Sequence, residues 1–194
     1  MAAPETRNIR NMSGVWSLNK TLSDNMDAMF RMEEMTQQGI PWIIRKIINY
    51  AGVELEMKQS SEVPSSSDDG TPVTSIAVKQ TVTPGGFNSN ETYVLDWSQR
   101  DATVPLFGSI SVYARYLPTT DLDDSALREK LTRVNEDATI IEEVVKSTQS
   151  GWQTTGIWGF EMIDGKRFYT RNTTTVKGEE QIKLRLVYDF VLRG

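Results

Sequence analysis

The most constraining feature of this sequence is a long series of segments, from residue 53 to the C-terminus, in which apolar and polar residues alternate. Val53, Leu55 and Met57, for example, alternate with charged residues. A period of two is typical of β-strands that bury one face. Asp164-Gly165, between two such segments, is typical of a β-hairpin turn. The pattern predicts strands over residues 12–19, 53–58, 73–83, 91–98, 109–117, 139–146, 152–163, 167–176 and 181–192.

Two stretches depart from this pattern. Between residues 23 and 52, Met26, Met29 and Phe30 recur at helical spacing, and Pro41 suits the first turn of a second helix. We therefore expect a short helix–turn–helix after the first strand. Residues 127–135 fit either a helix or a further strand.

About ten strands with short connections must protect their edges, and closure into a barrel removes the edges altogether. A barrel of this many strands is wide enough to enclose a ligand. The predicted fold is therefore all-β: a ten-stranded antiparallel up-and-down β-barrel with the helix–turn–helix as a lid. A chain of 194 residues fits one barrel domain over residues 12–194, preceded by a flexible N-terminal tail over residues 1–11.

The composition excludes several kinds of chemistry. The chain has no cysteine and no histidine, which excludes disulfides, thiolate nucleophiles and histidine acid–base catalysis and makes a zinc, copper or iron site improbable. We expect no metal and no cofactor. A net charge of −5 without a basic cluster disfavours nucleic-acid binding. The sequence shows no signal peptide and no apolar run of membrane-spanning length, so we expect a cytoplasmic protein, monomeric or weakly dimeric.

Two groups of motifs, in order, resemble the intracellular fatty-acid- and retinoid-binding proteins, which are members of the calycin superfamily. The first group comprises Gly14-Val-Trp16-Ser-Leu18, Ser23-Asp24, Gly39 and Arg45-Lys46. The second comprises Trp152, the Asp164-Gly165-Lys166 hairpin and a closing strand with Arg185 and Tyr188. The resemblance implies a calycin-like barrel that binds an apolar small molecule, such as a lipid, terpenoid or polyketide-like metabolite.

The chain departs from that family at the site for the ligand's carboxylate. The register of the Asp164-Gly165 hairpin places Phe160 where the family has its first arginine. Arg185 and Tyr188 are three residues apart, so they point to opposite faces of a regular strand. The chain is also longer, with expanded loops at 60–72 and 99–108. These departures favour a ligand that is bulkier and less acidic than a fatty acid.

A second, looser resemblance is to the lipocalin-like barrels among the cyclases of fungal natural-product pathways, including Diels–Alderases. Those enzymes fold an apolar polyene inside a barrel with little acid–base chemistry, a mode that suits a chain without histidine or cysteine. Two functions therefore lead: binding and carriage of an apolar metabolite and, as the alternative, a cofactor-independent cyclase or isomerase of the pericyclase type. A third, an adaptor with a filled barrel, predicts an exposed apolar patch.

The candidate site residues come from the expected inward faces. Tyr169 and Arg171 share one face of a strand, and a buried arginine needs a partner. That partner is either Glu142 or Glu143 within the chain, or an oxygen of the ligand. The candidate ligand-binding residues are Met29, Phe30, Trp42, Tyr93, Trp97, Tyr113, Tyr116, Trp158, Phe160 and Arg185, and the candidate catalytic, polarising residues are Tyr188, Tyr169, Arg171 and Glu142. For the aromatic residues and methionines, the competing interpretation is ordinary packing of the barrel interior.

Overall fold

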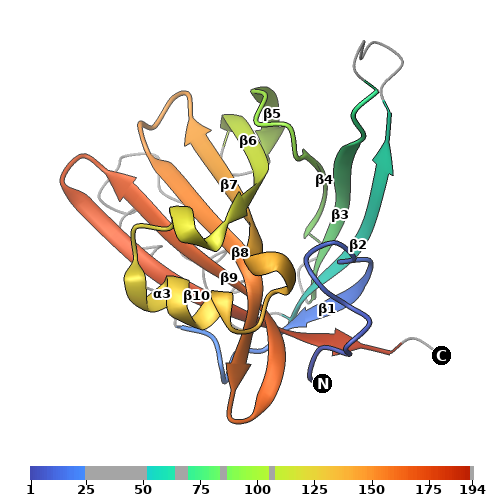
Figure 1. Cartoon of the computed structure of the whole chain (residues 1–194). Coiled ribbons are helices and arrows are strands. Elements are labelled where there is room, and N and C mark those ends of the chain that lie inside the picture. Colours follow the sequence, from blue (N-terminus) through green and yellow to red (C-terminus); the bar gives the residue numbers. More distant parts are fainter. Residues whose placement is uncertain (25–51, 64–69, 84–86, 105–107, 193–194) are drawn as a thin grey trace.

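The computed structural model describes residues 1–24, 52–63, 70–83, 87–104 and 108–192. Within them, ten strands form one antiparallel sheet in the order β4-β3-β2-β1-β10-β9-β8-β7-β6-β5 (Figure 1). Their bounds are β1 (Gly14–Leu18), β2 (Gly52–Glu62), β3 (Val73–Thr83), β4 (Phe87–Val94), β5 (Arg100–Val104), β6 (Gly108–Pro118), β7 (Thr139–Ser147), β8 (Gln153–Ile163), β9 (Lys166–Lys177) and β10 (Glu180–Val191). The prediction of an all-β fold with ten antiparallel strands is confirmed.

The sheet curls because its two edge strands, β4 and β5, are joined by a short connection. Val15 lies opposite Val191 in the β1–β10 ladder, while β4 and β5, consecutive in the chain, form the two edges of the sheet. Figure 1 shows the strands curved around a common interior as a half-barrel. Near the edges, the backbone N–H of Trp97 donates a hydrogen bond to the carbonyl of Ala114 at 2.8 Å, which ties the segment after β4 to β6. Residues from distant parts of the sequence therefore face one interior.

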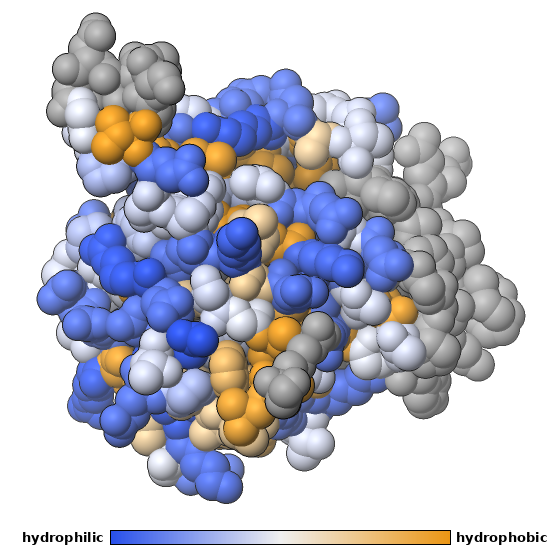
Figure 2. All heavy atoms as spheres, turned by 90° about the vertical axis from the view of Figure 1, so that its right-hand side faces the viewer, coloured by the Kyte–Doolittle hydropathy of each residue, from blue (hydrophilic) through white to orange (hydrophobic). Residues whose placement is uncertain are grey.

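β2 shows how the alternating sequence builds this wall. Val53, Leu55 and Met57 are buried on its inner face, whereas Glu56 and Lys58 are exposed. The neighbouring strand β3 is divided in the same way. The molecular surface on this side is accordingly mainly hydrophilic, with hydrophobic residues in small separate groups (Figure 2). Each large apolar side chain moved to the inside contributes about 1.5–3 kcal/mol.

The turn between β8 and β9 fixes the register of the strands that carry the site. Asp164 and Gly165 both have positive φ, 48° and 72°, as a two-residue type I′ hairpin requires. The hairpin predicted from Asp164-Gly165 is thereby confirmed. Its register places Trp158 opposite Arg171 and Phe160 opposite Tyr169.

Residues 125–138 cover part of the outer face of the sheet. The ambiguous segment 127–135 proves largely helical: α3 (Ser125–Thr132) is capped by Asp124, whose carboxylate accepts a hydrogen bond from the backbone N–H of Leu127 at 3.0 Å. The short 3-10 helices η1 (Thr119–Asp121) and η2 (Glu136–Ala138) flank it. Leu131 is fully buried in a second apolar cluster with Ile140 and Ile157, outside the barrel.

The expected loop at 99–108 contains an additional strand, and this corrects the prediction from the sequence. β5 pairs with β6 along its whole length, from Arg100 opposite Val112 to Val104 opposite Gly108. Residues 101–103 are exposed, so no alternation of apolar and polar side chains marks the strand. The predicted helix–turn–helix lies at residues outside those that the structure describes. No helix of the described segments is long and apolar enough to cross a membrane.

The first twelve residues are anchored to one end of the barrel, although the sequence predicts a flexible tail for residues 1–11. Ile9 and Met12 are buried, and the N–H of Ala3 donates a hydrogen bond to the carbonyl of Arg167 at 2.7 Å. Gln59 of β2 accepts a hydrogen bond from the N–H of Met12 at 2.7 Å and donates one to the carbonyl of Ile9 at 3.3 Å. The prediction missed these contacts because Ala3 and Ile9 are too far apart to form a periodic pattern.

Candidate functional site

Four neighbouring strands bring a row of aromatic and polar side chains together on the inner face of the barrel. Tyr169 and Arg171 are two residues apart on β9 and therefore share that face. Tyr169 lies opposite Tyr188 of β10, and Arg171 lies opposite Trp158 of β8. Phe160 lies two residues beyond Trp158, and the Tyr169 ring contacts the rings of Trp158, Phe160 and Tyr188.

Arg171 lies at the centre of this row. Its Nε donates a hydrogen bond to the hydroxyl oxygen of Tyr169 at 2.6 Å, and its guanidinium carbon lies 3.8 Å from the centre of the Trp158 ring. Its Nη2, in contrast, is shielded from solvent and has no hydrogen-bond partner among the described residues. An unpaired buried donor costs about 1–3 kcal/mol, and more when it is charged. The described residues therefore supply no acceptor for this cationic donor.

Glu143 supplies the negative charge nearest to Arg171 on the barrel wall. It lies opposite Gly156 in the β7–β8 ladder, and its Oε2 accepts a hydrogen bond from the indole N–H of Trp158 at 2.8 Å. A Cβ at position 156 would lie only 3.1 Å from that oxygen, so the glycine makes room for the carboxylate to fold across β8. Trp158 thus has a cation over its face and a carboxylate at its edge.

Tyr93 and Glu91 of β4 approach the same tryptophan from the opposite side of the half-barrel. The Tyr93 ring packs edge-on against Trp158, with 4.9 Å between ring centres. The Tyr93 hydroxyl donates a short hydrogen bond to Glu91, whose other oxygen accepts one from Ser89 at 3.0 Å. The cluster of Arg171, Trp158, Glu143, Tyr93, Tyr169 and Tyr188 is hereafter called the inner cluster.

Burial controls the ionisation of the inner cluster. Burial raises the pKa of the Glu143 carboxyl above its usual value, although Arg171 and the Trp158 hydrogen bond oppose the shift. The pKa values of Tyr93, Tyr169 and Tyr188 are raised for the same main reason, so these hydroxyls stay protonated. Burial alone would lower the pKa of Arg171, but the surrounding tyrosines and Glu143 raise it, so the guanidinium stays charged.

The inner cluster is suited to polarising an oxygen of a bound molecule. Arg171 is a charged donor, and the tyrosine hydroxyls around it are neutral donors, all held by strands and all shielded from bulk water. Among the described residues, the Glu143 carboxyl is the carboxyl acceptor whose charge acts on Arg171. Within the described segments no group of three or more acidic side chains could hold a metal ion.

Seven of the candidates named from the sequence face the interior. Six of them lie on the wall described above: Tyr93, Trp158, Phe160, Tyr169, Arg171 and Tyr188. The seventh, Tyr116, lies nearer to the N-terminal segment, where its hydroxyl accepts a hydrogen bond from Gln59 and Arg10 covers its ring. Whether these residues bind a ligand or act in catalysis stays a prediction. Met29, Phe30 and Trp42 lie outside the described residues.

Three other candidates lie on the outer face of the sheet. Glu142 accepts a hydrogen bond from Arg115 at 2.7 Å, so its neighbour Glu143 is the inward carboxylate of this strand. Tyr113 and Trp97 contact each other, with 5.9 Å between ring centres. Tyr113 is the odd-numbered neighbour of the inward residues Val112 and Ala114, and Trp97 stacks on outward-facing Arg115.

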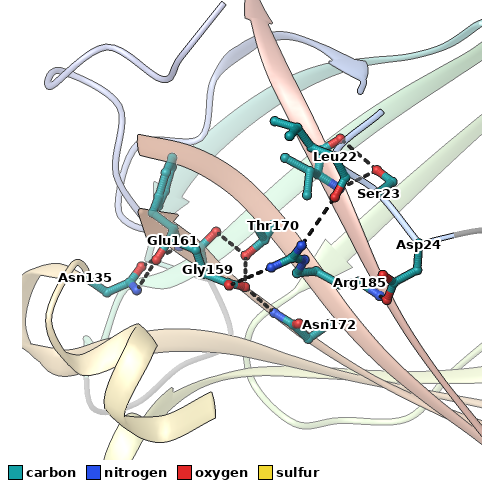
Figure 3. Close-up of polar contacts among 11 residues, drawn as sticks. Leu22, Ser23, Asp24, Asn135, Gly159, Glu161, Thr170, Asn172 and Arg185 are labelled. Carbon is teal, nitrogen blue, oxygen red and sulfur yellow. Dashed lines mark hydrogen bonds and ion pairs between the residues drawn. The ribbon is translucent and has the colours of Figure 1, made fainter. Parts of the chain in front are cut away.

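Arg185 also faces outward, which corrects its choice as a ligand-binding residue; the three-residue separation from Tyr188 predicted only that the two point to opposite faces. Figure 3 shows it between β9 and the segment that follows β1. Its Nη1 lies 3.8 Å from the buried carboxylate of Glu161, and its Nη2 donates to the carbonyl of Leu22 at 3.4 Å. Glu161 also accepts hydrogen bonds from Thr170 and Asn172. Arg185 is therefore part of an outer polar network and does not contact the inner cluster.

Sequence reasoning ranked Glu143 beside Glu142 and missed Glu91. Strand parity could have found Glu91, because it precedes the candidate Tyr93 by two residues and so shares its face. Parity could not separate Glu142 from Glu143, because Ile140 and Ile141 before them are both buried, one outside and one inside the barrel.

Comparison with known proteins gives two relatives of known class and one solved structure. The chain is 29% identical to a probable pericyclase, scpY, of Mollisia scopiformis over 98% of this chain and 95% of the relative. It is also 29% identical to the pericyclase pydY of an Acremonium species, over 98% of this chain and 97% of the relative. No protein-family model matches.

The structural comparison concerns the fold alone. The extracellular fatty-acid-binding protein As-p18 superposes with a TM-score of 0.51 at 10% sequence identity, covering 95% of this chain and 100% of As-p18. This likeness confirms the predicted resemblance to the fatty-acid-binding barrels, and the two relatives agree with the predicted resemblance to fungal cyclases. The chain is thus similar along nearly its whole length to two pericyclases, and it has the curled ten-stranded architecture of the fatty-acid-binding proteins.

Proposed function

We propose that this protein is a cofactor-independent pericyclase, which folds an apolar conjugated substrate inside its half-barrel and polarises a carbonyl oxygen of that substrate with Arg171. The observation that carries the proposal is the Arg171 Nη2 donor, which is buried beside Trp158 and has no hydrogen-bond partner in the described part of the chain. A carbonyl oxygen of a bound substrate would satisfy that donor.

A pericyclic reaction needs little from the protein besides shape and polarisation. In a cycloaddition, two carbon–carbon bonds form as π bonds are redistributed within one molecule, and no atom, proton or electron enters or leaves. Walls that hold the reacting ends in contact replace an unfavourable search through open conformations. Trp158, Tyr169 and Tyr188 are rigid, flat side chains suited to that task.

Arg171 would lower the barrier by withdrawing electron density from the unsaturated system through the carbonyl. A hydrogen bond to a charged group contributes about 1.5–3 kcal/mol. If that energy is realised mainly in the transition state, it corresponds to roughly a 10- to 100-fold increase in rate. The reaction thus requires no histidine, cysteine or cofactor, in agreement with the composition of the chain.

The second candidate function is carriage of an apolar metabolite without turnover. The likeness in fold to a fatty-acid-binding protein favours it. Both functions require that an apolar small molecule binds against the inner face. They differ in whether that molecule is converted to a product before it is released.

The test is to incubate the purified protein with the substrate of the Acremonium pericyclase and to follow an isomeric product by chromatography and mass spectrometry. We expect an isomer of unchanged mass to form faster with the wild type than without protein. Arg171→Met should reduce the rate about 10- to 100-fold, whereas Glu142→Gln on the outer face should leave it unchanged. Stoichiometric binding of the unchanged substrate, without isomerisation, would support the carrier instead.

A further inference from the structure

The inner cluster places a strong acceptor as well as a strong donor around one tryptophan. Arg171 lies over the face of Trp158, and Glu143 accepts the N–H at its edge. The Tyr93 hydroxyl lies near both carboxylates: it donates to Glu91, and its proximity lowers the pKa of Glu143. Polarisation of a carbonyl oxygen by Arg171 does not involve the Glu143 carboxyl.

Arginine and glutamate side chains form direct ion pairs on the outer face of the sheet, but Arg171 and Glu143 on the inner face do not. On the outer face the chain joins arginine and glutamate directly, Arg115 to Glu142 at 2.7 Å and Arg185 to Glu161 at 3.8 Å. Among the ion pairs of the described residues, none joins Arg171 to Glu143. Desolvation in the interior is unfavourable for both charged groups, and Arg171 Nη2 finds no partner within the described segments. Opposite charges held apart in this way are available to a third molecule.

The Glu143 carboxylate can also accept further hydrogen bonds. A carboxylate offers about four acceptor positions, and the indole N–H of Trp158 fills one of them. Gly156 opposite leaves the carboxylate room on the inner face.

We propose that the site recognises its ligand at two points, with the ligand's carbonyl oxygen on Arg171 and a neighbouring N–H or O–H of the ligand on Glu143. The substrate class is then an apolar molecule whose head group carries an acceptor and a donor side by side, as a lactam, a primary or secondary amide or a hydroxy-carbonyl compound does. This inference rests on the site of the proposed function and specifies which pericyclase substrates the site accepts.

The test uses two ligands that share one chain and differ only in the donor. Oleamide has a carbonyl oxygen and an N–H, and methyl oleate has only the carbonyl oxygen. Each is titrated against the full-length protein with the neutral dye Nile red as the displaced reporter. We expect the wild type to bind oleamide about tenfold or more tightly than methyl oleate, as one charge-assisted hydrogen bond provides.

The variants assign that preference to Glu143. Glu143→Leu should bring the two affinities together, and Glu143→Gln, which keeps one acceptor oxygen and the shape of the side chain, should retain part of the difference. Arg171→Met should weaken both ligands and leave their ratio close to that of the wild type. Glu142→Gln, one residue away on the outer face, is the matched control and should change nothing.

The outcomes separate this inference from the proposed function. Equal affinities in the wild type, or a preference that survives Glu143→Leu, would overturn two-point recognition even where the isomerisation assay succeeds. A preference abolished by Glu143→Leu supports it even where no isomer forms, and the carrier function would then stand. Failure of both ligands to displace the dye would contradict both proposals, since each requires an apolar site on the inner face.

Discussion

At the scale of single residues, we expect Arg171 of the inner cluster to contribute to function without stabilising the fold. Arg171 has a buried donor with no partner among the residues that the structure describes, so Arg171→Met removes a desolvated charge and keeps a side chain of similar length. We expect its free energy of unfolding to equal that of the wild type or to exceed it by up to about 2 kcal/mol. Urea denaturation followed by tryptophan fluorescence measures this.

Arg185→Met provides the contrast. Arg185 lies beside the carboxylate of Glu161, which is only 3% exposed, so its loss leaves a buried charge with one partner fewer. We expect this variant to lose about 1–3 kcal/mol. If Arg171→Met proved the more destabilising of the two, Arg171 would have a structural role and the proposed function would lose its main support.

We expect the contribution of Glu143 to the free energy of unfolding to decrease as the pH rises. Burial raises the pKa of this carboxyl in the folded state, so the folded protein binds the proton more tightly than the unfolded chain does. The favourable contribution is complete below the ordinary glutamate pKa of about 4.3, and it is lost as the pH rises through the raised value. The unfolding free energy of Glu143→Gln relative to wild type should therefore increase with pH, in denaturation series from pH 4 to pH 8. Glu142→Gln should show no such trend.

The residue-level site was predictable where one face of a strand is solvated and unpredictable where both are covered. The Asp164-Gly165 turn fixed the register of β9, and this was enough to place Tyr169 and Arg171 inward. On β7 the outer face is covered by α3, so Ile140 and Ile141 are both buried and the period of two disappears. Glu142 and Glu143 could be told apart only once the packing of α3 was known.

At the scale of elements, Asn135 substitutes for a missing stretch of β7 beside β8. The β7–β8 ladder ends with Ile141 opposite Trp158, and beyond it the Asn135 side chain accepts from the N–H of Phe160 at 2.9 Å and donates to its carbonyl at 3.0 Å. Asn135→Ala leaves both backbone groups unpaired in a buried place, and we expect a loss of about 2–4 kcal/mol. Thermal unfolding measures it, and Arg133→Ala, on the exposed surface two residues earlier, is the control, with an expected loss below about 1 kcal/mol.

Elements with a clear alternation of buried and exposed side chains were predictable from the sequence. Elements defined only by hydrogen bonds to a neighbouring strand, or by a few contacts with the sheet, were not. β3 was predicted with its observed bounds, because its buried residues Ile76, Val78 and Val82 alternate with polar ones. β5 is an edge strand whose residues 101–103 are exposed, so only its ladder with β6 defines it. α3 is mainly polar and buries chiefly Leu131, which is too little for a helical period.

At the scale of the whole molecule, barrel curvature was predictable from the number of strands, whereas the closing of one end by the N-terminal segment was not. A long series of short-linked strands curves around one interior; β1 and β10 pair within the sheet, and β4 and β5 are its edges. The N-terminal segment joins parts of the chain that are distant in sequence. Asn8 donates to Glu136 after α3 at 2.7 Å, and Arg167 of β9 donates to the carbonyl of Arg7 at 2.6 Å. Such contacts depend on the assembled barrel and leave no local pattern.

Ile9 is the residue through which this segment should stabilise the whole barrel. Its side chain is 1% exposed and belongs to the same apolar core as Trp16 and Tyr169, so Ile9→Ala leaves a cavity at the end of the interior. We expect a loss of about 2–4 kcal/mol in unfolding free energy. Because the core is continuous, the single cooperative transition should shift as a unit, without an early step for the N-terminal segment. Glu5→Ala, at an exposed position of the same segment, should leave the midpoint unchanged, and an equally stable Ile9→Ala variant would show that residues 1–11 behave as the flexible tail that their sequence suggests.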